Sequence, residues 1–180
     1  MTISPDTLPR MTPEAYLAYE REQSIRHELV DGYLYAMTGA SDRHEEIALN
    51  LAAALRVHLR GSNCRAYKGD LKLRVGDDFF YPDVFVRCGL ERGDPYFKSD
   101  PVLIAEVLSP STQRYDRGDK RLAYASLPSL QEYLLIAQDL CRVDVLRRNT
   151  GWAVETLTQP DVRLHLASVD FSMTLAELYE

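Results

Sequence analysis

The spacing of apolar and capping residues predicts two helices in the first third of the chain. Thr12-Pro13-Glu14 is typical of a helix start, because threonine accepts hydrogen bonds from free backbone N–H groups and proline suits the first turn. We expect this helix to end near Glu22. A second helix is expected to begin at Ser41 or Asp42 and to end at Gly61. Apolar residues at helical spacing give it one buried face: Ile47, Leu51, Ala54, Leu55 and Leu59.

Alternating and continuous apolar runs predict the strands. Residues 28–35 predict a hairpin, since Asp31-Gly32 between β-forming residues supplies the turn. Further strands are expected over 71–75, 80–86, 101–108 and 132–137, with short ones near 143–146 and 154–157, and helices over 116–126 and 175–179. From residue 43 onward, the order helix, three strands, helix, strand predicts an α+β domain built on one mixed sheet, with a hairpin on each side.

Length, charge and cysteine content narrow the class of protein. The chain has 180 residues and a formal net charge of −6, and we expect a loose leader over residues 1–10 and a single domain over 11–180. The chain has no apolar run long enough to span a membrane and no secretory signal, which predicts a cytoplasmic protein without membrane contact. Its three cysteines are odd in number and far apart, which predicts reduced thiols rather than a disulfide framework. The acidic balance counts against a general nucleic-acid coating protein, but not against an enzyme with local basic residues.

Three acidic residues stand next to apolar strands. Asp83 opens an apolar segment after Pro82, Glu106 lies near the end of the most apolar strand, and Glu28 opens the first hairpin. A carboxylate at the end of a central strand loses water, which costs several kcal/mol without compensation. A divalent cation compensates efficiently where carboxylates converge, and Mg²⁺ often takes one or two carboxylates and keeps the rest of its shell for water and phosphate.

A cationic helix face is expected close to these acids. Asp116, Lys120 and Tyr124 repeat every four residues and therefore share one face of the predicted helix. If that face is turned toward the strand ends, Lys120 can reach a phosphate or an attacking water. Carboxylates for a metal ion and a cation for developing charge together predict metal-assisted phosphodiester hydrolysis.

These residues resemble the PD-(D/E)XK nuclease superfamily, and more closely its Uma-two family of restriction endonuclease-like proteins. The matching stretches are His27-Glu28-Leu29-Val30-Asp31-Gly32, Tyr81-Pro82-Asp83-Val84, Glu106-Val107-Leu108-Ser109-Pro110-Ser111-Thr112, Asp116-Arg117-Gly118-Asp119-Lys120, Tyr124 and Glu132-Tyr133-Leu134-Leu135-Ile136. The resemblance implies an α/β/β/β/α/β core with a mixed central sheet, cleavage of DNA with Mg²⁺ or Mn²⁺ held by carboxylates, and a homodimer. Leu108 occupies the usual lysine position of the superfamily, so the resemblance implies that the lysine has moved to the following helix, at Lys120.

Each candidate residue also has a simpler structural interpretation. Asp83 could be a strand-entry residue, Glu106 could pair with an arginine, and Glu28 could face solvent in its hairpin. Lys120 could form a surface pair with Asp116 worth about 0.3–0.5 kcal/mol.

Four accessory candidates remain, with a group of arginines. His44 could approach the site or have a surface or capping role, and Asp70 could face the same cleft from a strand. Asp116 could accompany Lys120 at the site. Tyr124 could act only by packing in the core. The basic residues Arg114, Arg117 and Arg121 could be a solvated helix face or could neutralise phosphates.

Three hypotheses follow. The first is a metal-dependent endonuclease in which Asp83 and Glu106, with Glu28, hold the metal and Lys120 assists. The second is a catalytically silent domain that binds nucleic acid or serves assembly, motivated by Leu108. The third is a hydrolase for small phosphoesters. Convergence of Glu28, Asp83 and Glu106 next to Lys120 would favour the first, and carboxylates on opposite faces of the sheet would exclude it.

Overall fold

The computed structural model describes residues 10–37, 39–91, 93–109 and 118–180. The helices are α1 (Pro13–Arg21), α2 (Asp42–His58), α4 (Asp119–Ala125) and α5 (Leu175–Tyr179). The strands of the first half are β1 (His27–Val30), β2 (Tyr33–Ala36), β3 (Cys64–Lys68), β4 (Lys72–Val75), β5 (Asp78–Phe80) and β6 (Val84–Cys88). Those of the second half are β7 (Phe97–Lys98), β8 (Pro101–Leu108), β9 (Glu132–Ala137), β10 (Val143–Arg147), β11 (Val154–Leu157), β12 (Arg163–Leu166) and β13 (Phe171–Thr174). Short 3₁₀ turns occupy Arg148–Thr150 and Ala167–Val169.

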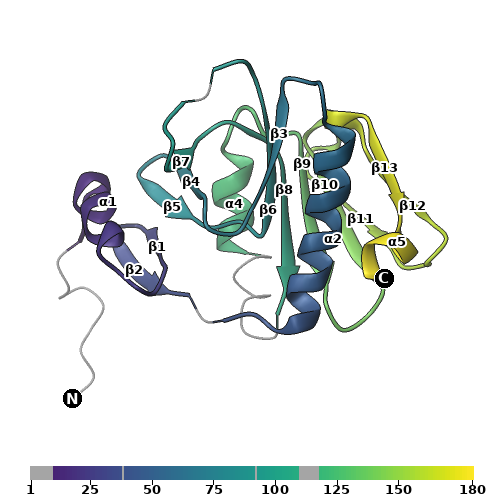
Figure 1. The fold of residues 1–180 in the computed structure, drawn as a ribbon, viewed down its shortest axis with the longest axis horizontal. Coiled ribbons are helices and arrows are strands. Elements are labelled where there is room, and N and C mark those ends of the chain that lie inside the picture. Colours follow the sequence, from purple (N-terminus) through teal and green to yellow (C-terminus); the bar gives the residue numbers. More distant parts are fainter. Residues whose placement is uncertain (1–9, 38, 92, 110–117) are drawn as a thin grey trace.

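A six-stranded mixed sheet forms the centre of the molecule, in the order β11-β10-β9-β8-β6-β3 (Figure 1). The pair β8–β9 is parallel and its neighbouring pairs are antiparallel. Side chains alternate between two cores. One core lies under α2 and contains Ile47 and Leu51, and the other lies under α4 and contains Tyr124. Strand β8 is therefore buried on both faces, which explains its continuous apolar run.

A second sheet in the order β2-β1-β5-β4-β7 lies beside the central sheet. The β1–β2 hairpin turns at Asp31 and Gly32, whose φ angles of 50° and 81° give the left-handed conformations that a tight hairpin turn requires. Helix α1 packs on this sheet through Tyr16, whose ring centroid lies 5.0 Å from that of Phe79. Together α1, β1 and β2 form one end of the molecule, and the β12–β13 hairpin with α5 lies toward the other (Figure 1).

Most predicted elements are confirmed, including α1, the β1–β2 hairpin, α2, α5 and the α+β class with a mixed central sheet. The capping predictions also hold, since Thr12 accepts from the backbone N–H of Ala15 and Ser41 from that of His44. The helix predicted over 116–126 is described from Asp119 onward, and its earlier part lies outside the described residues.

Three strand predictions need correction. The strand predicted over 80–86 is divided between β5 and β6, because Pro82 cannot donate to a ladder and the chain passes from one sheet to the other there. The strand predicted over 71–75 belongs to the second sheet as β4, and the unpredicted β3 takes the edge position beside β6. The β12–β13 hairpin was also not predicted.

The prediction of reduced thiols is wrong for two of the three cysteines. Cys64 and Cys88 form a disulfide. The two residues are directly opposite each other in the β3–β6 pair, and Gly89 N–H donates to the carbonyl of Asn63 just beyond them. This bond identifies a non-hydrogen-bonded pair, in which opposed side chains come closest. Cys141 is a free thiol.

Among the described residues, no helix is both long enough and apolar enough to cross a membrane. Cytoplasmic localisation, the domain boundary at residue 11 and the homodimer stay predictions. The leader predicted over residues 1–10 lies almost entirely outside the described residues.

Candidate active site

Asp83 and Glu106 meet on one face of the central sheet. In the β6–β8 ladder Val84 pairs with Ala105, so Asp83 and Glu106 are the next residues along antiparallel neighbours. The backbone N–H of Asp83 donates to Glu106 Oε2 at 3.2 Å, and that of Val107 donates to Asp83 Oδ2 at 2.7 Å. These reciprocal bonds hold two carboxylates together at the strand ends. This pair therefore does not lie on opposite faces of the sheet, the arrangement that would exclude the nuclease hypothesis.

Helix α4 supplies the cation beside these acids. Lys120 Nζ lies 3.0 Å from Glu28 Oε1 and 3.4 Å from Glu106 Oε1. One turn later, the hydroxyl of Tyr124 donates to Glu106 Oε1 at 2.9 Å. The i,i+4 spacing predicted from the sequence thus places both side chains on Glu106, and the interpretation of Lys120 as a surface residue is wrong, since its side chain is only 9% exposed.

Glu28 reaches the site from the second sheet. Its side chain is buried on β1, and its Oε1 accepts from the backbone N–H of Tyr81 at 3.1 Å. The interpretation of Glu28 as a solvent-facing hairpin residue is therefore wrong. Because Tyr81 stands two residues before Asp83, this bond fixes the segment that carries Asp83 to the first hairpin.

His44 is also part of the site. It lies in the first turn of α2, is buried, and places Nε2 at 3.2 Å from Asp83 Oδ2 and Nδ1 at 3.8 Å from Glu45 Oε1. Burial disfavours the charged imidazolium, but the hydrogen bond with Asp83 and the charges of Asp83 and Glu45 outweigh it, so the pKa of His44 is raised above 6.5. A surface role is excluded, because the imidazole is buried against Asp83.

Tyr124 acts here as a hydrogen-bond donor. It is fully buried, and desolvation together with the charges of Glu106 and Glu28 raises its pKa well above 10. The phenol therefore stays neutral and donates to Glu106. It cannot serve as a base at physiological pH, and its edge-on packing against Phe80 and Tyr133 fixes its ring.

The acids fit a hard divalent cation with an incomplete protein shell. Among the described residues, no group of three or more His, Cys, Asp and Glu side chains is arranged to hold a metal ion. Asp83 and Glu106 nevertheless present adjacent carboxylates, and the Asp83 side chain is 22% exposed. Mg²⁺ commonly takes one or two carboxylates and completes its shell with water and phosphate, so this pair suits Mg²⁺ or Mn²⁺ better than a closed zinc site.

Two predicted residues lie away from the site. Asp70 is not in a strand but in the bend after β3, where its side chain is 83% exposed and lies 3.5 Å from Arg26 Nε. Arg121 donates to the carbonyl of Trp152 at 3.0 Å and so serves packing between α4 and the turn before β11. Asp116, Arg114 and Arg117 lie outside the described residues.

Sequence reasoning missed the supporting backbone donors and one buried acid. The N–H groups of Tyr81 and Val107 hold Glu28 and Asp83, and no side-chain pattern reveals them. Glu20 on α1, also not predicted, accepts from the Tyr81 hydroxyl at 2.9 Å and from the His27 N–H at 2.8 Å. Glu20 shares the buried face of α1 with Tyr16, four residues earlier, but a glutamate there has no distinctive sequence signal, because its burial depends on the second sheet.

Comparison with known proteins identifies relatives along most of the chain. A family model, Uma2, described as "Putative restriction endonuclease", matches residues 13–176. The uncharacterised protein slr1290 of Synechocystis sp. is 38% identical over 176 residues, which cover 95% of this chain and 92% of that protein. A second uncharacterised Synechocystis protein, sll1609, is 32% identical over 143 residues, covering 74% and 78%.

A solved structure of similar fold comes from a cyanobacterial protein. It is the crystal structure of a protein from Anabaena variabilis described as a putative nuclease belonging to DUF820. It superposes with a TM-score of 0.78 at 19% identity, over 94% of this chain and 97% of that one. At this identity the likeness establishes the restriction endonuclease-like arrangement of helices and sheets and no more than that.

Proposed function

Because the chain belongs to the Uma2 family of restriction endonuclease-like proteins, we propose that it is a nuclease that hydrolyses DNA phosphodiester bonds with Mg²⁺ or Mn²⁺. The observation that carries this proposal is the meeting of Asp83 and Glu106 beside Lys120. Membership of the family supports nuclease chemistry, and the donor set supports the metal.

Asp83 and Glu106 would hold the metal ion. Each uses one oxygen to accept a backbone N–H, which fixes the orientation of the carboxylate without removing its charge. His44 positions Asp83 from the side of α2, and Tyr124 positions Glu106 from the side of α4. When bound, the metal ion supplies an activated water and charge stabilisation at the phosphate.

Lys120 would stabilise the charge that develops on the phosphate. Its ammonium group is a compact charge on a flexible stem, and Glu28 and Glu106 hold it next to the strand ends. We assign to Glu28 the positioning of Lys120, since Lys120 is its ion-pair partner at 3.0 Å. A direct role of Glu28 as a metal ligand stays a prediction, and it would require Lys120 to move away.

One observation favours the catalytically silent alternative. Lys120 already compensates two carboxylates, Glu28 and Glu106, and the described residues form no cluster of three or more metal-ligating side chains. A protein in which this internal ion pair is permanent would keep the fold without hydrolysis. Such a protein would bind no Mn²⁺ near the acids.

The test is nicking of supercoiled plasmid with Mg²⁺ or Mn²⁺, and with EDTA as the metal-free control. Asp83→Asn and Glu106→Gln keep the shape of the side chains and remove the charge. We expect each to lower the rate by more than about 100-fold, since even outer-shell changes at metal sites cost about 10–100-fold. Asp161→Asn, at an exposed acid outside the site, is the matched control and should cleave like the unsubstituted protein.

Calorimetric titration with Mn²⁺ separates the two functions. Binding that disappears in Asp83→Asn supports the nuclease. Equal nicking by the unsubstituted protein and Asp83→Asn would overturn the assignment of this site. Absence of both binding and nicking would leave the silent domain as the function.

A further inference from the structure

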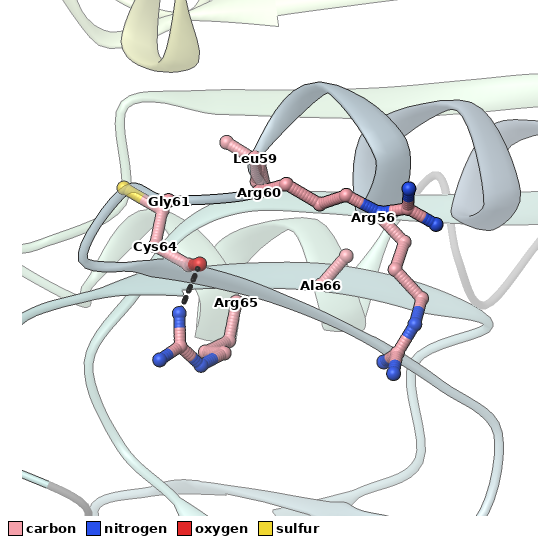
Figure 2. A pocket seen from close by; sticks show the side chains of 7 residues that line it. All are labelled: Arg56, Leu59, Arg60, Gly61, Cys64, Arg65 and Ala66. Atoms are coloured by element: carbon pink, nitrogen blue, oxygen red, sulfur yellow. Dashed lines mark hydrogen bonds between the residues drawn. The ribbon is translucent and has the colours of Figure 1, made fainter.

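A hollow lined by three arginines lies at the far end of α2 and β3 from the acids. Its volume is about 230 Å³, and its lining is Arg56, Leu59, Arg60, Gly61, Cys64, Arg65 and Ala66. Figure 2 shows the guanidinium groups of Arg56 and Arg60 on one side of the hollow and that of Arg65 on the other. No acidic residue belongs to this lining. We call the hollow the arginine pocket.

The three arginines lack carboxylate partners within the part of the chain that the structure describes. Arg65 donates to the carbonyls of Ser62 and Cys64, and none of the ion pairs between described residues includes Arg56, Arg60 or Arg65. All three are exposed. Arg56 and Arg60 are four residues apart on or just beyond one helix, where like charges destabilise by a few tenths of a kcal/mol. In a chain with a net charge of −6, this local excess of positive charge suits an anion.

Helix α2 and strand β3 run side by side from the arginine pocket toward the acids. At its other end, Lys68 of β3 forms an ion pair with Glu45 of α2, and Lys68 is paired with Val84, the residue after Asp83. Residues 65 to 68 span about 10 Å of strand and residues 45 to 56 about 16 Å of helix. Each DNA strand carries a phosphate about every 3.4 Å of helix axis, so the pocket lies about three to five nucleotides from the acids.

We propose that the arginine pocket binds a backbone phosphate of the DNA substrate, about three to five nucleotides from the bond that is cut. This inference rests on the proposed nuclease function. The pocket would give this acidic chain a local group of positive charges that contacts DNA on one side of the site. Arginine suits this task because its planar fork of donors matches phosphate oxygens.

A purely structural explanation exists for part of the cluster. Basic residues near the end of a helix interact favourably with the helix dipole, which would account for Arg56 and Arg60. It does not account for Arg65, which is on β3. The structural explanation predicts a change in thermal stability without a change in DNA affinity.

The experiment measures DNA affinity by fluorescence anisotropy in EDTA, where no metal-dependent cleavage occurs, across a range of salt concentrations. The test variant is Arg56→Gln/Arg60→Gln/Arg65→Gln, and Arg163→Gln, an exposed arginine on β12 outside the pocket, is the matched control. We expect the slope of log affinity against log salt to become less steep by about 1 in the triple variant, because one phosphate contact is lost, and to stay unchanged in the control. Equal slopes for the triple variant and the unsubstituted protein would overturn the proposal, and so would an equal loss in the control.

A second readout separates the pocket from the chemistry. Bis(p-nitrophenyl) phosphate is too small to reach from the acids to the arginine pocket. With Mn²⁺, the triple variant should hydrolyse it at the unsubstituted rate while its KM for DNA rises. A fall in this rate equal to the loss on DNA would overturn the pocket as a remote subsite. Absence of hydrolysis of both substrates by the unsubstituted protein would overturn the nuclease function, and the salt slope would still decide whether the pocket binds DNA.

Discussion

Replacement of Lys120 by methionine tests whether this lysine holds the site together. Methionine keeps an unbranched chain of similar length but removes the ammonium group that lies 3.0 Å from Glu28 and 3.4 Å from Glu106. The three side chains are 9%, 9% and 4% exposed, so the two carboxylates cannot be compensated by bulk water. Removing one partner of a buried ion pair costs about 3–5 kcal/mol, because the other charge stays buried.

The matched control for this substitution is Lys68→Met. Lys68 also pairs with a glutamate, Glu45, but the two side chains are 29% and 55% exposed. An exposed pair of this kind contributes about 0–1 kcal/mol. At about 2–4 °C per kcal/mol for a chain of this size, Lys120→Met should lower Tm by about 6–20 °C and Lys68→Met by at most about 4 °C.

Urea unfolding and thermal melts measure this difference. Mn²⁺ provides a second observation, because the two acids left by Lys120→Met would gain a cation that binds the folded state. At about 100 times its dissociation constant, such a ligand stabilises by about 2.7 kcal/mol. Mn²⁺ should therefore restore part of the lost Tm in Lys120→Met and have little effect on Lys68→Met. If Lys120→Met and Lys68→Met unfold at the same urea concentration, the lysine does not compensate the buried acids and the reasoning fails.

Three further predictions concern other parts of the molecule. Tyr124→Phe removes one hydrogen bond from Glu106 and should destabilise by about 1–3 kcal/mol in urea unfolding; no measurable loss would contradict the buried contact. The double substitution Cys64→Ser/Cys88→Ser removes the disulfide between residues 24 apart and should lower the free energy of unfolding by about 3–4 kcal/mol. Thermal melts with and without reductant would detect this loss. Reductant should destabilise the unsubstituted protein and leave the double variant unchanged. Burial raises the pKa of Asp78, so its charged form costs stability at neutral pH, and this cost disappears as pH falls through that pKa. Asp78→Asn should therefore be more stable than the unsubstituted protein at pH 7 and equally stable below about pH 4. A stability advantage that persists in acid would contradict burial as the cause.

The convergence of the site was predictable because it depends on local rules. Asp83 and Glu106 lie at the ends of adjacent apolar strands, and the face of a strand follows from alternation. Lys120 and Tyr124 share a helix face because they are four residues apart. The position of Glu28 does not follow from such local rules, because β1 belongs to a different sheet. The burial of Glu28 depends on contacts over 50 residues away, such as that with Tyr81.

Other features depend on long-range pairing and could not be predicted from local patterns. The segment 64–68 mixes basic and small residues, and its strand conformation comes from pairing with β6. That same register brings Cys64 and Cys88 together, although their spacing in the sequence resembles no disulfide motif. His44 was placed correctly on a helix, but its burial depends on the approach of Asp83 from the sheet.

Glu106 joins parts of the molecule that are otherwise separate. Its two oxygens contact the start of β6 through Asp83 and helix α4 through Lys120 and Tyr124, and Lys120 extends the link to β1. Loss of this carboxylate would therefore weaken contacts between both sheets, and under the proposed function it would also stop cleavage. A chain of this fold that did not bind DNA would still need Glu106 and Lys120 to hold these parts together. The presence of these two residues in a relative would therefore not by itself indicate nuclease activity, which only cleavage measurements can show.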